Sequence, residues 1–76
     1  MTKIELVRRQ KGLTQVELAK LIGVSGPAIV QVERGYRKPW PKIRKNIAQA
    51  LGYPEEELFA PDGWPLQVEL EEVIGR

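Results

Sequence analysis

The stretch LTQVELAKLIGVSGPAIVQVERG, residues 13–35, decides the fold of this chain. Thr14 near its start is a good helix N-cap, and Glu17 follows three residues later to complete a capping box. The apolar residues that come next keep helical spacing. Gly23 then ends the helix, because glycine tolerates the positive φ that a chain adopts just past a helix end. We therefore expect a helix over residues 15–22.

A second short helix is expected directly after the first. Ser25 is its N-cap, and it runs to about Arg34 before Gly35 ends it. Two helices joined by so tight a turn cross steeply and nearly touch. The crossing needs a small residue, the turn needs a residue free to adopt positive φ, and the inner face of the second helix needs apolar side chains. The residues at these places are Ala19, Gly23, Ile29 and Val32. Together they predict a helix-turn-helix from Gln15 to Arg34.

Three further helices are expected around this unit. The first covers about residues 2–11, and Gly12 ends it. The fourth follows a proline-containing loop and covers about residues 41–51. The fifth is short, over residues 55–59, with three glutamates where the helix dipole favours negative charge. The sequence thus predicts an all-α, five-helix domain over residues 1–60.

The remaining segment, residues 61–76, is a short C-terminal extension whose pattern is ambiguous. Its apolar residues fit the spacing of a helix, and some of them also alternate as in a strand. Pro65 suits a first helical turn and favours the helix. The extension is rich in apolar residues, which makes it a candidate dimerisation segment through Leu66, Leu70, Val73 and Ile74.

The composition excludes several classes of site. The chain has no cysteine and no histidine, so a disulfide and a thiolate nucleophile are absent, and a zinc site would depend on carboxylates alone. The first residues lack the apolar region of a signal peptide. No apolar stretch approaches the roughly 20 residues that span a bilayer. We therefore expect a cytoplasmic protein with no membrane segment, no metal and no cofactor.

The modest net charge of +2 conceals a strong asymmetry. Residues 1–53 contain eleven Lys and Arg against three Glu, a net charge of +8. Residues 54–76 contain one Arg against six Glu and one Asp, a net charge of −6. A basic body suggests an anionic partner, most simply nucleic acid, although a merely solvated surface is the alternative.

The motifs resemble those of the Xre/Cro-type helix-turn-helix family of phage repressors and bacterial regulators. The resemblance covers about residues 4–60. The stretches that carry it are GLTQVELA (12–19), GVS (23–25), Ile29, ERG (33–35), IAQALG (47–52) and ELF (57–59). It implies a five-helix, phage-repressor-like fold. It also implies transcriptional regulation, by a repressor that binds a double-stranded DNA operator.

Position by position, the resemblance implies a set of DNA contacts. Gln15 would contact a phosphate, and the second helix of the motif would address the major groove. The residues placed for groove contact are Ser25, Gly26, Pro27 and Gln31, and those that would hold the backbone are Arg34, Arg37, Lys38 and Lys42. Helix geometry agrees, because residues 26, 27, 30, 31 and 34 share the face opposite Ile29 and Val32, and an α-helix fits the major groove.

Two of these positions depart from the family's usual pattern. Gly26 has no side chain, and Pro27 has neither an N–H nor a polar side chain. Direct hydrogen-bonded readout then falls mainly on Gln31, with Ser25 as a second candidate. Glutamine can form a bidentate pair with adenine, worth about 1–3 kcal/mol of discrimination. Pro27 and Val30 are placed to contact thymine methyl groups instead.

Two further residue sets have structural interpretations. In related domains the positions of Arg8 and Glu33 form a buried ion pair, and loss of one partner from such a pair costs about 3–5 kcal/mol. Trp40, between two prolines, is expected to cap the core, with stacking on a sugar-phosphate as the alternative.

Three classes of function can be compared with the sequence. The first is a sequence-specific DNA-binding regulator that acts as a homodimer. The second is an antitoxin or interaction module whose tail binds a protein partner while the helix-turn-helix represses its own operon. The third, an enzyme, is disfavoured because the sequence offers no nucleophile–base pair and no phosphate-binding glycine loop.

Overall fold

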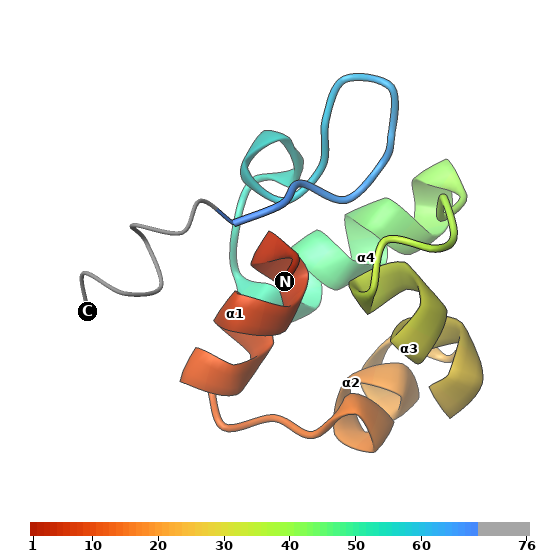
Figure 1. Ribbon diagram of the computed structural model, residues 1–76. Coiled ribbons are helices and arrows are strands. Elements are labelled where there is room, and N and C mark those ends of the chain that lie inside the picture. Colours follow the sequence, from red (N-terminus) through yellow and green to blue (C-terminus); the bar gives the residue numbers. More distant parts are fainter. Residues whose placement is uncertain (69–76) are drawn as a thin grey trace.

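The computed structural model describes residues 1–68, which contain four α-helices and no strand (Figure 1). The elements are α1 (Lys3–Gln10), α2 (Gln15–Ile22), α3 (Gly26–Glu33), α4 (Pro41–Leu51) and a single 3₁₀ turn, η1 (Glu55–Glu57). The expected all-helical architecture is confirmed for this part of the chain.

The predicted fifth helix over residues 55–59 is wrong. The N–H groups of Leu58 and Phe59 both donate to the carbonyl of Glu55, at 2.9 and 2.8 Å, so that the segment makes a single tight turn. Leu58 and Phe59 are buried directly after it. So short a segment gains too few hydrogen bonds to offset the cost of nucleating an α-helix.

Apolar side chains from all four helices and from the segment after η1 form one core. Six of them are fully buried, and each such Leu or Ile contributes roughly 1.5–3 kcal/mol relative to an exposed side chain. They are Ile4, Leu18, Ile29, Ile47, Leu51 and Leu58. Helix α2 contributes less than its apolar pattern suggests, because Val16 and Leu21 remain 57% and 63% exposed.

The segment after η1 folds back onto the start of α1 in an extended conformation. The N–H of Lys3 donates to the carbonyl of Leu66 at 2.8 Å, and the N–H of Val68 donates to the carbonyl of Met1 at 2.9 Å. Pro65 forms an isolated bridge with Phe59. The prediction that Pro65 begins a helix is therefore wrong as far as residue 68. The rest of the predicted tail helix lies outside the described residues.

Two kinds of feature are absent from residues 1–68. No helix in this part of the chain combines the length and the apolar character that crossing a membrane requires. The same residues contain no group of three or more acidic, histidine or cysteine side chains arranged to hold a metal ion.

Candidate nucleic-acid interface

The first turn of α2 is fixed by a reciprocal cap. The hydroxyl of Thr14 accepts a hydrogen bond from the N–H of Glu17 at 3.0 Å, and the N–H of Thr14 donates to the Glu17 carboxylate at 2.8 Å. The backbone N–H of Thr14, and after it hydrogen bonding of the Thr14 hydroxyl to the carboxylate, hold the pKa of Glu17 below its usual value. The cap sets the position of the next residue, Gln15, at the start of the helix.

A left-handed glycine makes the turn from α2 to α3. Gly23 has a φ of 74°, which a residue with a side chain rarely adopts. The N–H of Val24 donates to the carbonyl of Ala19 at 3.0 Å, and Ala19 is buried, as are Ile29 and Val32 on the inner face of α3. Ser25 then caps α3, its hydroxyl accepting from the N–H of Ala28 at 3.3 Å.

The outer face of α3 meets the start of α2 in a shallow hollow. Gln31 and Pro27 are exposed there, and Val30 and Gly26 are half-buried. The residues that line the hollow are Gln15, Val16, Gly26, Pro27, Val30 and Gln31. Helical spacing groups Val16 with the other apolar side chains of α2, but it does not say which neighbours cover a side chain, so the place of Val16 in this hollow could not be predicted from the sequence.

A hydrogen-bonded network ties α1, α2 and α3 together beside this hollow. The Arg8 guanidinium forms an ion pair with the Glu33 carboxylate, through Nε to Oε2 and through Nη2 to Oε1 at 3.2 Å. Arg8 Nη1 also donates to the carbonyl of Leu13 at 2.6 Å, and Gln15 Nε2 donates to Glu33 Oε1 at 3.1 Å. Glu33 is fully buried and Arg8 is 7% exposed. The network therefore fixes Gln15 relative to the end of α3.

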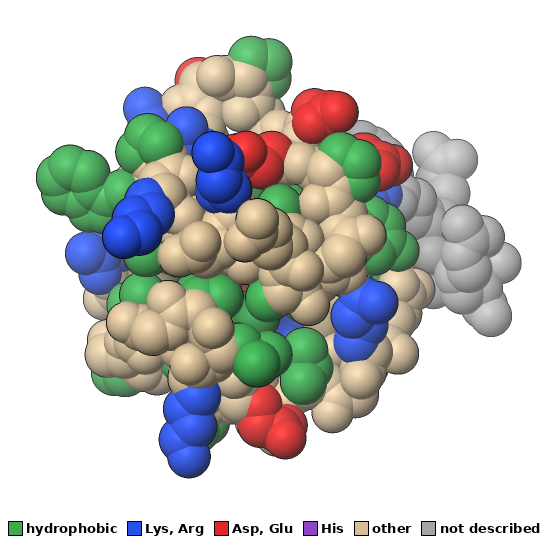
Figure 2. Space-filling view, turned by 180° about the vertical axis from the view of Figure 1, so that it is seen from behind, with side chains coloured by type: hydrophobic (Ala, Val, Ile, Leu, Met, Phe, Trp, Pro, Cys, Tyr) green, Lys and Arg blue, Asp and Glu red, His purple; other side chains and the backbone are tan. Residues whose placement is uncertain are grey.

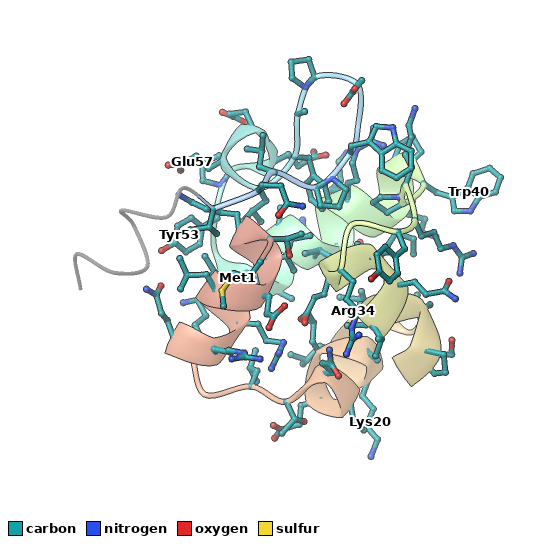
Figure 3. The ribbon with its side chains drawn as sticks, viewed as in Figure 1. Met1, Lys20, Arg34, Trp40, Tyr53 and Glu57 are labelled. Carbon is teal, nitrogen blue, oxygen red and sulfur yellow. The ribbon has the colours of Figure 1, made fainter. Side chains whose placement is uncertain are left out.

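Basic side chains surround the end of α3 and the loop after it. Arg34 lies at that end (Figure 3). Figure 2 shows most of the visible Lys and Arg side chains on the left of the view. The four cations predicted to contact a phosphate backbone are all exposed, namely Arg34, Arg37, Lys38 and Lys42.

The prediction that Trp40 caps the core is wrong. Its side chain is 72% exposed and projects away from the body of the molecule (Figure 3). Pro39 is buried instead, and Arg44 Nη1 donates to the Pro39 carbonyl at 3.1 Å. Arg44, which sequence reasoning did not single out, therefore anchors the loop that presents Trp40. Tyr36, just after α3, is also 75% exposed.

Of the predicted dimerisation residues, only Leu66 is described. It is half-buried, and its N–H donates to the carbonyl of Leu58 at 3.0 Å. Leu70, Val73 and Ile74 lie outside the described residues.

Comparison with known proteins is consistent with this geometry. A family model described as helix-turn-helix matches residues 4–58. An uncharacterized HTH-type transcriptional regulator of Sinorhizobium fredii is 42% identical over 55 residues, covering 72% of this chain and 71% of that protein. Similar regulators of Bacillus subtilis and Methanothermobacter thermautotrophicus are 35% and 39% identical, covering 79% and 80% of this chain and 87% and 90% of theirs.

Proposed function

The chain belongs to the Xre/Cro-like helix-turn-helix family, whose members are DNA-binding transcriptional regulators rather than enzymes, and from this premise we propose that it is a sequence-specific repressor. In this proposal it acts in the cytoplasm as a homodimer. Each protomer inserts α3 into the major groove of an operator half-site.

The observation that carries this proposal is the two-sided character of α3. Ile29 and Val32 are buried against the core, while Gln31 and Pro27 on the opposite side are exposed beside the start of α2. A helix that is anchored on one face and free on the other can enter a groove about 12 Å wide without disturbing the core. The exposed cations beyond its end, such as Arg34, then lie where phosphates flank the groove.

The proposed DNA contacts are of two kinds, to base edges and to phosphates. Gln31, with Ser25, reads base edges, and Gln15 donates to a phosphate with the amide hydrogen that its bond to Glu33 leaves free. The backbone contacts fall to Arg34, Arg37, Lys38 and Lys42. The exposed indole N–H of Trp40 is a further phosphate donor at the same edge.

A homodimer follows from the small footprint of one recognition helix. A single helix-turn-helix reads only a few base pairs, and two half-sites one helical turn apart provide enough sequence for specificity. We propose that the C-terminal extension supplies the contact between protomers through Leu66, Leu70, Val73 and Ile74.

Selection of bound sequences from a pool of random duplexes tests this function. We expect enrichment of two related half-sites with a fixed spacing near one helical turn of DNA. Gln31→Ala is expected to blur the enriched motif. Gln49→Ala, which changes an exposed glutamine of α4 outside the hollow, serves as its matched control. Recovery of no motif by the wild-type chain would refute sequence-specific binding.

A further inference from the structure

We propose that the hollow between α2 and α3 recognises thymine in the major groove through its C5 methyl group. This inference rests on the proposed function and adds to it the kind of base that the surface prefers. The contact surface is formed by Val16, Pro27 and Val30, and Gln15 and Gln31 line the same hollow.

The side chains that line the hollow offer few hydrogen-bond donors or acceptors. Its only polar side chains are Gln15 and Gln31, and the first is already bound to Glu33. Pro27 has no N–H, and Ser25, which precedes the helix, is not among the residues that line the hollow. Apart from the two glutamines, the side chains that line the hollow are therefore apolar. A surface of this kind discriminates bases by apolar contact rather than by donors and acceptors.

Major-groove base edges present one apolar group among their donors and acceptors, the thymine methyl. The exposure of Val16 is the observation that most favours such a contact. Val16 lies in the first turn of α2 and is 57% exposed, and it lines the same hollow as the half-buried Val30. Covering these side chains with a methyl group removes apolar surface of both partners from water.

Gly26 keeps the hollow open. A Cβ placed on it would meet no atom within 4 Å, and its φ does not lie in the left-handed region. Neither packing nor backbone conformation therefore requires glycine at this position. Its missing side chain leaves room for a base edge to approach the first turn of α3.

The test compares duplexes that differ only in methyl groups. A duplex selected by the full chain is prepared with thymidine and again with deoxyuridine at every thymidine position, and the two dissociation constants are measured. We expect the uracil duplex to bind more weakly by about fourfold for each methyl group buried. Equal affinity for the two duplexes would overturn the inference while leaving DNA binding itself intact. Failure to select any duplex would instead be a failure of the proposed function.

Protein variants show whether the hollow itself senses the methyl group, since uracil also changes DNA shape. Val16→Ala and Val30→Ala should each bring the ratio of the two dissociation constants closer to one. Leu21→Ala is the matched control, because it removes an exposed apolar side chain of α2 that does not line the hollow. Lys42→Ala should weaken binding to both duplexes and leave the ratio unchanged. If Val16→Ala and Val30→Ala retain the wild-type ratio, the methyl group is not read by this surface.

Discussion

Gln15 Nε2 lies 3.1 Å from Glu33 Oε1 and donates a hydrogen bond to it, which joins the first residue of α2 to the last residue of α3. The same carboxylate accepts two hydrogen bonds from Arg8 on α1. One buried charge therefore sets the positions of α1, α2 and α3 relative to one another, and α2 and α3 carry the proposed hollow for DNA contact. Thr2 adds a fourth connection, since its hydroxyl donates to the backbone carbonyl of Glu33.

Glu33→Gln should destabilise the domain severely. It leaves the guanidinium of Arg8, which is 7% exposed, without its counter-charge. Breaking a buried pair in this way costs about 3–5 kcal/mol, a large part of the stability of a small domain. Urea unfolding followed by circular dichroism measures the loss.

Glu5→Gln is the control for that experiment. Glu5 also forms an ion pair, with Arg9 at 2.6 Å, but Arg9 is 61% exposed. Water screens such a pair, so the free energy of unfolding should change by less than about 1 kcal/mol. If Glu33→Gln proves as mild as Glu5→Gln, the network does not hold the three helices in the way described.

Thr14→Ala should weaken the start of α2. Loss of an N-cap hydroxyl costs typically about 1 kcal/mol of protein stability. The pKa of Glu17 should rise in part, because the bond from the Thr14 hydroxyl disappears while the stronger cause, the bond from the Thr14 backbone N–H, remains. An NMR titration of the Glu17 carboxyl carbon reports this change.

The sign of the accompanying pH dependence follows from the lowered pKa of Glu17. The stabilisation that the Glu17 carboxylate gains from Thr14 is fully present above the pKa that Glu17 has in the unfolded chain. It is lost as the pH falls through the lower pKa of Glu17 in the folded state. Thr14→Ala should therefore lose less stability than the wild type on acidification. An unchanged Glu17 titration in the variant would exclude the hydroxyl as a cause.

Gln31→Ala should relax sequence preference more than it weakens non-specific binding. Gln31 is exposed on α3 and lines the hollow, whereas the amide of Gln15 beside it already donates one hydrogen bond to Glu33. Loss of a bidentate contact with adenine removes about 1–3 kcal/mol of discrimination at a single position. Affinities for single-base variants of the selected duplex reveal the position. If every base keeps its preference, Gln31 is not a reader, and DNA shape carries the specificity.

A chain ending at Val68 should be monomeric at tens of micromolar, whereas the full chain should be a dimer. The shortened chain keeps the backbone hydrogen bonds that Leu66 and Val68 make with the start of the chain and with Leu58. It loses Leu70, Val73 and Ile74. Sedimentation velocity distinguishes the two states. Leu70→Glu in the full chain should also give monomers, and a shortened chain that remains a dimer would place the interface elsewhere.

Local sequence rules predicted the helix-turn-helix well because its signals lie within a few residues of one another. The capping box of Thr14 and Glu17 and the left-handed glycine at position 23 depend only on groups a few residues away in the chain. The bounds of α2 accordingly agree with the prediction, the predicted N-cap Ser25 of α3 is confirmed, and α3 ends at Glu33, one residue before its predicted end.

The errors arose where a residue's environment depends on distant segments. Trp40 and Pro39 are adjacent and both suit a core contact, and the bond from Arg44 to the Pro39 carbonyl accompanies the burial of the proline. The local pattern around Pro65 suits a first helical turn. Its bridge to Phe59 involves a residue outside that pattern, so the extended conformation could not be predicted from local spacing. The exposure of Val16 likewise follows from where α3 crosses α2, which spacing along one helix does not specify.

The central claim is that this chain binds duplex DNA through α3 and the exposed cations Arg34, Arg37, Lys38 and Lys42. Its most direct test is the salt dependence of the affinity for the selected duplex. Neutralisation of about five phosphates per subunit predicts a log–log slope of roughly −4 to −5 per subunit. Lys42→Ala should weaken binding to all duplexes alike and reduce the slope by about one unit. An affinity that does not change with salt would contradict the account. So would a Lys42→Ala variant with the same affinity and the same slope as the wild type.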